Sequence, residues 1–96
     1  MDRESVIGKL QANKAILQKK YPLASLALFG SFALGEQSKE SDIDILVELN
    51  GPMGIEFVDL LIGLEKIFGG HKVDLVSKSG VNPRYWPFIQ KDLIYV

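Results

Sequence analysis

Two aspartates one residue apart are the first residues of this chain whose spacing suits chemistry. Asp42 and Asp44 form the stretch D-I-D, and the apolar run I-L-V follows at once. Strands avoid aspartate, and two charges of the same sign on one strand face repel each other. Because strand side chains alternate, both carboxylates would point the same way, two steps of about 3.3 Å apart. Such a pair suits hard cations, whose charge turns repulsion into coordination. The simpler interpretation is an exposed pair on an edge or loop.

A third aspartate, Asp74, interrupts the apolar run V-D-L-V at 73 to 76. In the middle of a buried strand, an unpaired charge would be costly. A two-metal phosphoryl-transfer site needs a third carboxylate beside the first two, and an adjacent strand is a natural place to mount it. The alternative is an edge strand on which Asp74 faces water.

The pair Gly30-Ser31 directly follows the apolar run 25 to 29. A glycine there lets the backbone approach a phosphate closely, and Ser31 can open a short helix whose N–H groups and hydroxyl hold the β- and γ-phosphates. The alternative is that Gly-Ser is an ordinary strand terminator.

The surrounding pattern predicts the elements that must position these side chains. Apolar residues at helical spacing predict helices at 3 to 20, before Pro22, and at 54 to 68, closed by Gly69-Gly70. The other predicted elements are strands at 25 to 29, 42 to 49, 72 to 76 and 92 to 96, a short helix or turn at 31 to 36, and a short or bent helix at 82 to 91 capped by Asn82. This order describes a small α/β or α+β layer with helices packed on a sheet.

The helix predicted at 54 to 68 is apolar over more than half of its circumference. Such a helix has more than one neighbour. We expect the sheet on one side and another helix or a partner protein on the other.

Composition narrows the functional classes. The 96 residues, 47% of them hydrophobic, predict one globular domain, 1 to 96. A net charge of −1 argues against extended nucleic-acid binding, and the absence of cysteine excludes a disulfide framework and a thiolate nucleophile. No stretch approaches the roughly 20 apolar residues of a membrane helix. We therefore expect a soluble, cytoplasmic protein that does not engage a membrane.

The other candidate residues receive structural interpretations. His71 is the only histidine and stands beside a Gly-Gly turn, so we expect an exposed structural residue and neither a catalytic triad nor a zinc site. Tyr85, Trp86 and Phe88 are expected in the core rather than as a platform for a nucleobase.

The combination is more specific than its parts. Gly30-Ser31, ten intervening residues, D-I-D and a later-strand Asp74 together resemble the signature of the polymerase-β-like nucleotidyltransferase superfamily. Within it, the stretch G-S-F-A-L-G-E-Q-S-K-E-S-D-I-D-I-L-V in so short a chain resembles the minimal nucleotidyltransferases, the MNT or MntA-like group. The resemblance covers nearly the whole chain.

This resemblance implies a fold and a site. The fold would be α+β, a two-layer nucleotidyltransferase palm with a small mixed sheet flanked by helices. Asp42, Asp44 and Asp74 would bind two Mg²⁺ ions, with Asp74 also helping to deprotonate the acceptor hydroxyl, and Gly30 and Ser31 would bind the triphosphate of ATP. The reaction would be in-line attack on the α-phosphorus with pyrophosphate leaving.

The resemblance also implies a partner, a HEPN-domain protein in a toxin–antitoxin pair whose antitoxin transfers AMP onto a HEPN tyrosine. A chain this small would borrow a surface for base selection from that partner or from a second copy, as a hetero-oligomer or a homodimer. Relatives often have Arg where this chain has Leu34, which bears on triphosphate affinity. The alternative function is a non-catalytic antitoxin that neutralises its partner by occlusion, whereas primer-dependent polymerisation is disfavoured for want of a basic channel.

Overall fold

Two long helices form where apolar spacing predicted them, and the computed structural model describes residues 1–96 throughout. Helix α1 (Arg3–Lys20) begins after Asp2, whose carboxylate accepts a hydrogen bond from the Ser5 backbone N–H at 2.9 Å. Helix α3 (Glu56–Ile67) starts two residues later than expected, because Gly54 lies in a turn and donates its N–H to the Glu56 carboxylate at 2.8 Å. No helix of the chain combines the length and apolarity that a bilayer crossing requires.

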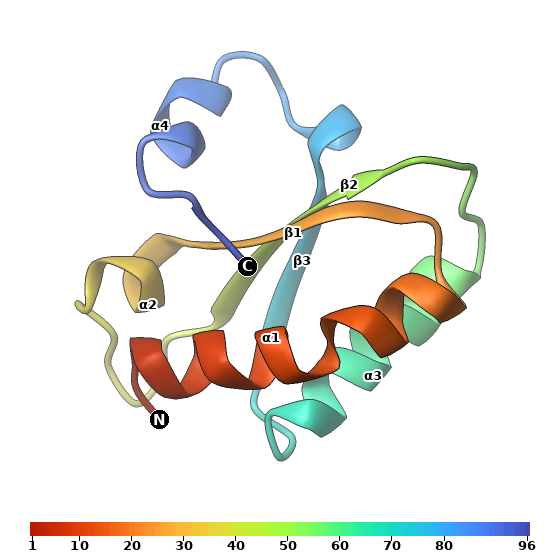
Figure 1. Cartoon of the computed structure of the whole chain (residues 1–96). Helices are drawn as coiled ribbons and strands as arrows, with labels where there is room; N and C mark the ends of the chain where they lie inside the picture. The colour runs from red at the N-terminus through yellow and green to blue at the C-terminus, as the bar shows by residue number, and fades with distance from the viewer.

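A four-stranded sheet forms the centre of the molecule, with the strand order β3-β2-β1-β4 (Figure 1). Strand β1 runs antiparallel to both β2 and β4, whereas β2 and β3 are parallel. The strands are β1 (Leu23–Phe29), β2 (Ile43–Leu49), β3 (Val73–Ser77) and β4 (Ile94–Tyr95). The predicted mixed sheet flanked by helices is therefore confirmed, and β3 is one of its two edge strands.

The hydrophobic core lies between the sheet and the helices α1 and α3, which cover the same face (Figure 1). Side chains that alternate along β2 point into this core, together with residues one or two turns apart on each helix. Fully buried members are Val6, Leu10, Ile43, Ile45, Val47, Leu60 and Leu64. Each such burial stabilises the fold by about 1.5–3 kcal/mol. The side chains of β2 therefore alternate. Its odd-numbered residues point into this core, and its even-numbered residues point to the opposite face of the sheet.

The opposite face of the sheet is only partly covered. Helix α4 (Trp86–Gln90) lies on this side, away from α1 and α3 (Figure 1). Leu46 is buried here and pairs in register with Ala27 of β1, which is buried too. Asp44, two residues before Leu46, points to this same face near the start of β2.

The C-terminal segment departs from the sequence-based expectations. The predicted helix at 82 to 91 is reduced to α4, because Asn82 caps a turn: its side chain accepts from the Arg84 N–H at 3.0 Å and its carbonyl from the Tyr85 N–H at 2.8 Å. Between this turn and β3 lies a 3-10 turn, η1 (Lys78–Gly80), where a loop was expected. The predicted core position of the aromatics is wrong for Tyr85 and Phe88, which are 61% and 64% exposed.

Candidate active site

Asp44 and Asp74 are direct neighbours across the parallel pair of strands β2 and β3. Asp44 is half-buried, whereas Asp74 is exposed. Of the two interpretations of Asp74, the structure shows the edge strand: β3 lies at the edge of the sheet and its aspartate faces water. The strand register nonetheless places Asp74 beside Asp44. Asp74 is therefore both exposed at the edge of the sheet and part of the carboxylate cluster.

Asp42 lies immediately before β2. The predicted strand, 42 to 49, had included it. Its side chain is about a third exposed, and the Lys72 Nζ lies 3.8 Å from its Oδ2. An ion pair this open to solvent contributes at most about 1 kcal/mol to stability. Lys72 therefore balances the charge of Asp42 without fixing the position of its carboxylate.

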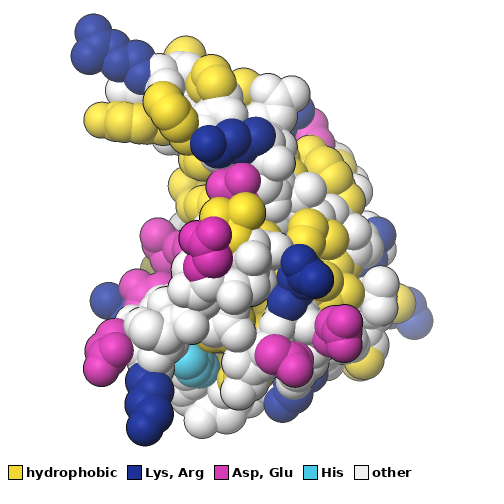
Figure 2. Space-filling model, turned by 90° about the vertical axis from the view of Figure 1, so that its left-hand side faces the viewer, with side chains coloured by type: hydrophobic (Ala, Val, Ile, Leu, Met, Phe, Trp, Pro, Cys, Tyr) yellow, Lys and Arg dark blue, Asp and Glu magenta, His cyan; other side chains and the backbone are white.

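The three carboxylates act on one another electrostatically. The pKa of the Asp44 carboxyl is raised from 3.8 to about 6, first by burial and then by the negative charges of Asp74 and Asp42 and a hydrogen bond to Asp74. Acidic side chains gather on this side of the molecule, below the apolar end formed by α4 (Figure 2). A cation placed among these groups would remove the repulsion between the carboxylates, which adds to the effect of burial on the pKa of Asp44.

Gly30 stands directly against the carboxyl of Asp44. Strand β1 leads straight into the short helix α2 (Gly30–Leu34), and Phe29, the last residue of β1, pairs in register with Asp44. Gly30 has a φ of +74°, and a Cβ atom on it would overlap Asp44 Oδ2 and lie 2.9 Å from its Cγ. Glycine is therefore required at position 30 because any side chain would occupy the space of the Asp44 carboxyl. The sequence alone did not show this requirement.

Four of the five sequence-predicted site residues meet here, and the fifth adjoins them. Gly30 contacts Asp44, which has Asp74 beside it and Asp42 within electrostatic reach. Ser31 follows Gly30 as the second residue of α2 and is half-buried. The residues that sequence reasoning missed are Lys72, whose only signal is its place just before the strand of Asp74, and His71, which is half-buried rather than exposed.

The donor set fits magnesium in its chemistry, since Mg²⁺ prefers hard oxygen ligands and carboxylates in particular. No three His, Cys, Asp or Glu side chains are already gathered closely enough to hold a metal ion by themselves. Mg²⁺ commonly takes only one or two carboxylates from the protein and fills its octahedron with substrate phosphates and water. The open arrangement of Asp42, Asp44 and Asp74 is compatible with that mode of binding.

Comparison with known proteins places this geometry in a family. The nucleotidyltransferase domain matches residues 11–96. The chain belongs to the nucleotidyltransferase domain family. A candidate protein adenylyltransferase of Methanocaldococcus jannaschii is 50% identical over 91 residues, which cover 91% of this chain and 90% of that protein. The protein adenylyltransferase MntA of Thermococcus cleftensis is 32% identical over 94 residues, with 97% and 94% of the two chains covered.

Solved structures agree with this assignment. A protein described as a candidate minimal nucleotidyltransferase superposes with a TM-score of 0.80 at 29% identity, over 98% of this chain and 95% of its own. A toxin–antitoxin structure with AMP-PNP matches with a TM-score of 0.71 at 24% identity, over 99% of this chain and 72% of that one, and shows the shared fold. The chain is therefore a nucleotidyltransferase with the minimal version of the fold, as its sequence indicated.

Proposed function

We propose that this nucleotidyltransferase is a Mg²⁺-dependent protein adenylyltransferase that moves AMP from ATP to a hydroxyl group of a partner protein. The observation that supports it most directly is the junction of Gly30, Asp44 and Asp74 on one face of the sheet. The relatives named protein adenylyltransferase support the choice of AMP and of a protein acceptor.

Each site residue has a role in this proposal. Asp42 and Asp44 hold two Mg²⁺ ions and Asp74 completes the set, while Gly30 and Ser31 receive the triphosphate at the start of α2. The bound ions would neutralise phosphate charge and favour the loss of pyrophosphate. Because Gly30 lies directly against Asp44, the residues proposed to bind the triphosphate have a fixed position relative to the carboxylates proposed to bind the metal ions.

The reaction transfers one phosphoryl unit. The acceptor hydroxyl oxygen forms a bond to the α-phosphorus of ATP, and the bond from that phosphorus to the bridging oxygen of the β-phosphate breaks. Pyrophosphate leaves with the electron pair, and the hydroxyl proton passes to Asp74, which is exposed and can meet an incoming side chain. The protein supplies position and charge rather than a covalent intermediate.

The partner in this proposal is a cytoplasmic HEPN-domain protein, with this chain as the antitoxin of the pair. Support comes from the relative named MntA and from the toxin–antitoxin complexes that share the fold. The exposed aromatic residues Tyr85 and Phe88 and the apolar side of α3 leave surface for such a protein to contact.

The test is transfer of labelled AMP from ATP to the HEPN protein encoded beside this chain, with Mg²⁺ present. The partner should gain the mass of one AMP, and Asp44→Asn should abolish the gain because it removes the central carboxylate. Glu4→Gln, which removes a charge at an exposed position of α1, is the matched control and should transfer normally. No transfer to any candidate partner under these conditions would contradict the proposal.

A second function, neutralisation by occlusion, is favoured by one observation. Ile55, Val58 and Ile62 form an exposed apolar stripe at the start and along the outer side of α3, with 81%, 52% and 46% of their surfaces accessible. A stripe of this kind suits a protein contact. If the double variant Asp42→Asn/Asp44→Asn still neutralises the partner fully in cells, occlusion rather than transfer is the function.

A further inference from the structure

His71 contacts the chain at the residue that precedes Asp42. It lies in the connection between α3 and β3, and its Nε2 is 2.7 Å from the Ser41 carbonyl oxygen. A carbonyl oxygen only accepts hydrogen bonds, so Nε2 must carry the proton that it donates. The Ser41 carbonyl thus fixes the tautomer of the His71 ring, and the hydrogen bond holds the backbone of Ser41 in place.

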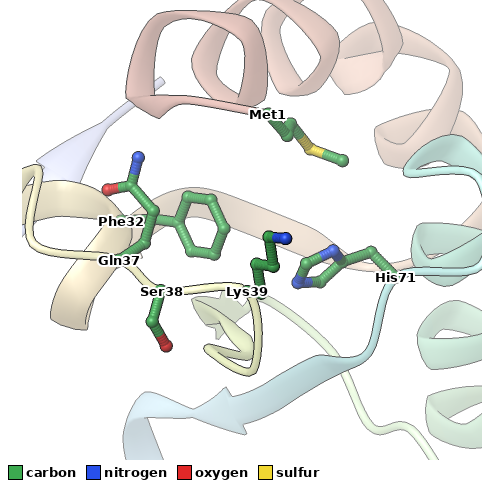
Figure 3. Close-up of a pocket in the computed structure, with 6 residues that line it drawn as sticks. All are labelled: Met1, Phe32, Gln37, Ser38, Lys39 and His71. Carbon is green, nitrogen blue, oxygen red and sulfur yellow. The ribbon is translucent and has the colours of Figure 1, made fainter.

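The same ring packs against helix α2. The ring centroids of Phe32 and His71 lie 5.6 Å apart with an interplanar angle of 84°, an edge-to-face contact. Phe32 directly follows Ser31 and is buried. Figure 3 shows both rings lining one pocket of ≈ 510 Å³, with the Lys39 side chain reaching toward His71. His71 therefore touches the helix that begins with Gly30-Ser31 and the loop that ends at Asp42.

Few other contacts fix this part of the loop. The Ser41 hydroxyl accepts from the Ser38 backbone N–H at 2.9 Å, which is a bond within the loop itself. The first anchor to the sheet comes only after Asp42, where the Ile43 N–H donates to the Lys72 carbonyl at 3.0 Å. On the near side of Asp42, the hydrogen bond from His71 ties the loop to a distant part of the chain.

We infer that His71 is a positioning residue for Asp42. Its N–H holds the Ser41 carbonyl while its ring rests on α2, so the backbone that carries Asp42 keeps a set place relative to Gly30-Ser31. The inference rests on the proposed function, in which these two segments hold the metal ions and the triphosphate of one ATP. A histidine that merely filled a turn would have no effect on metal binding.

The experiment compares Mn²⁺ binding to the wild type, His71→Phe and His71→Gln, measured by electron paramagnetic resonance with an ATP analogue that has a methylene bridge between its α- and β-phosphates. Phe keeps a ring beside Phe32 but donates no hydrogen bond, whereas the Gln amide places a donor near the original Nε2. Hydrogen exchange of the Ile43 amide shows whether the β2–β3 edge is intact in each variant, since its bond to Lys72 does not involve the ring.

We expect His71→Phe to bind Mn²⁺ about tenfold more weakly and His71→Gln to stay near the wild type, with Ile43 protected in all three, because loss of supporting hydrogen bonds commonly weakens metal affinity by about 10–100-fold. Equal affinity in wild type and His71→Phe would overturn the inference, as would equal weakening in both variants, because the donor restored in His71→Gln would then make no difference. The analogue cannot transfer AMP, so Mn²⁺ binding is measured whether or not the protein proves to be an adenylyltransferase.

Discussion

Gly30 and Asp44 occupy adjoining space that admits no side chain on the glycine. A Cβ atom on Gly30 would overlap the Asp44 carboxyl, and the φ of +74° places the residue in the left-handed region. Gly35, which ends α2, has a nearly equal φ of +72° but nothing within 4 Å of its would-be Cβ. The two glycines thus share one backbone requirement, and only Gly30 also makes room for a carboxylate.

Alanine at these two glycines should separate backbone strain from the site. Both Gly30→Ala and Gly35→Ala should lower the free energy of unfolding by about 1–2 kcal/mol, because alanine resists the left-handed conformation. Only Gly30→Ala should also displace Asp44 and reduce AMP transfer, by about a hundredfold. Denaturant unfolding and transfer rates on both variants check this, and a Gly35→Ala protein as inactive as Gly30→Ala would show that strain alone explains the loss.

The raised pKa of Asp44 predicts how stability depends on pH without metal. The folded-state pKa of about 6 exceeds the ordinary 3.8, so the protonated carboxyl favours the folded state below pH 3.8 and this advantage is lost as pH rises through about 6. The full shift corresponds to about 3 kcal/mol, which solvent screening at this half-buried group reduces to about 1 kcal/mol.

Asp44→Asn should therefore match the wild type in stability near pH 3.5 and exceed it by about 1 kcal/mol above pH 7. Urea unfolding across that range measures the difference. A stability difference for Asp44→Asn that is the same at every pH would contradict the assigned cause.

Magnesium should stabilise the wild-type protein through the same carboxylates. At tenfold excess over its dissociation constant, a ligand adds about 1.4 kcal/mol, which for a chain of this size raises Tm by about 5–10 °C. EDTA should reverse the shift, and Asp44→Asn should show none of it. A magnesium shift that persists in Asp44→Asn would place the ion elsewhere on the protein.

Local patterns in the sequence predicted most of the fold, since helix spacing and apolar runs reflect burial that each element achieves along its own length. The pairing of Asp44 with Asp74 could be anticipated because both interrupt apolar strands. The contacts of His71 with Ser41 and Phe32 could not be anticipated, because they join residues about thirty to forty positions apart. They depend on the path of a loop, which the spacing of apolar residues does not predict. The short α4 was misjudged for a similar reason: Asn82 can cap either a helix or a turn.

Leu34 stands where the family resemblance leads us to expect an arginine, and substituting it tests whether a side chain at this position reaches the triphosphate. It lies at the end of α2 and is 49% exposed, so a longer side chain fits without disturbing the core. Leu34→Arg should lower the KM for ATP about fivefold with kcat unchanged, as expected for one added charge-assisted hydrogen bond made equally in the ground and transition states. Leu34→Gln, which adds length without charge, is the control. No change in KM would mean that position 34 does not reach the triphosphate.

The exposed stripe of Ile55, Val58 and Ile62 on α3 should carry the contact with the partner protein. Ile62→Lys should leave the free energy of unfolding within about 0.5 kcal/mol of the wild type, because the side chain already faces solvent. It should weaken binding of the HEPN protein at least about tenfold in calorimetry, since a buried charge at an apolar contact is costly. Phe88→Lys alters a more exposed residue, 64% against 46% for Ile62, on the other side of the sheet and tests the competing contact over α4. If Phe88→Lys weakens binding and Ile62→Lys does not, the partner docks over α4 and the face that bears Asp44.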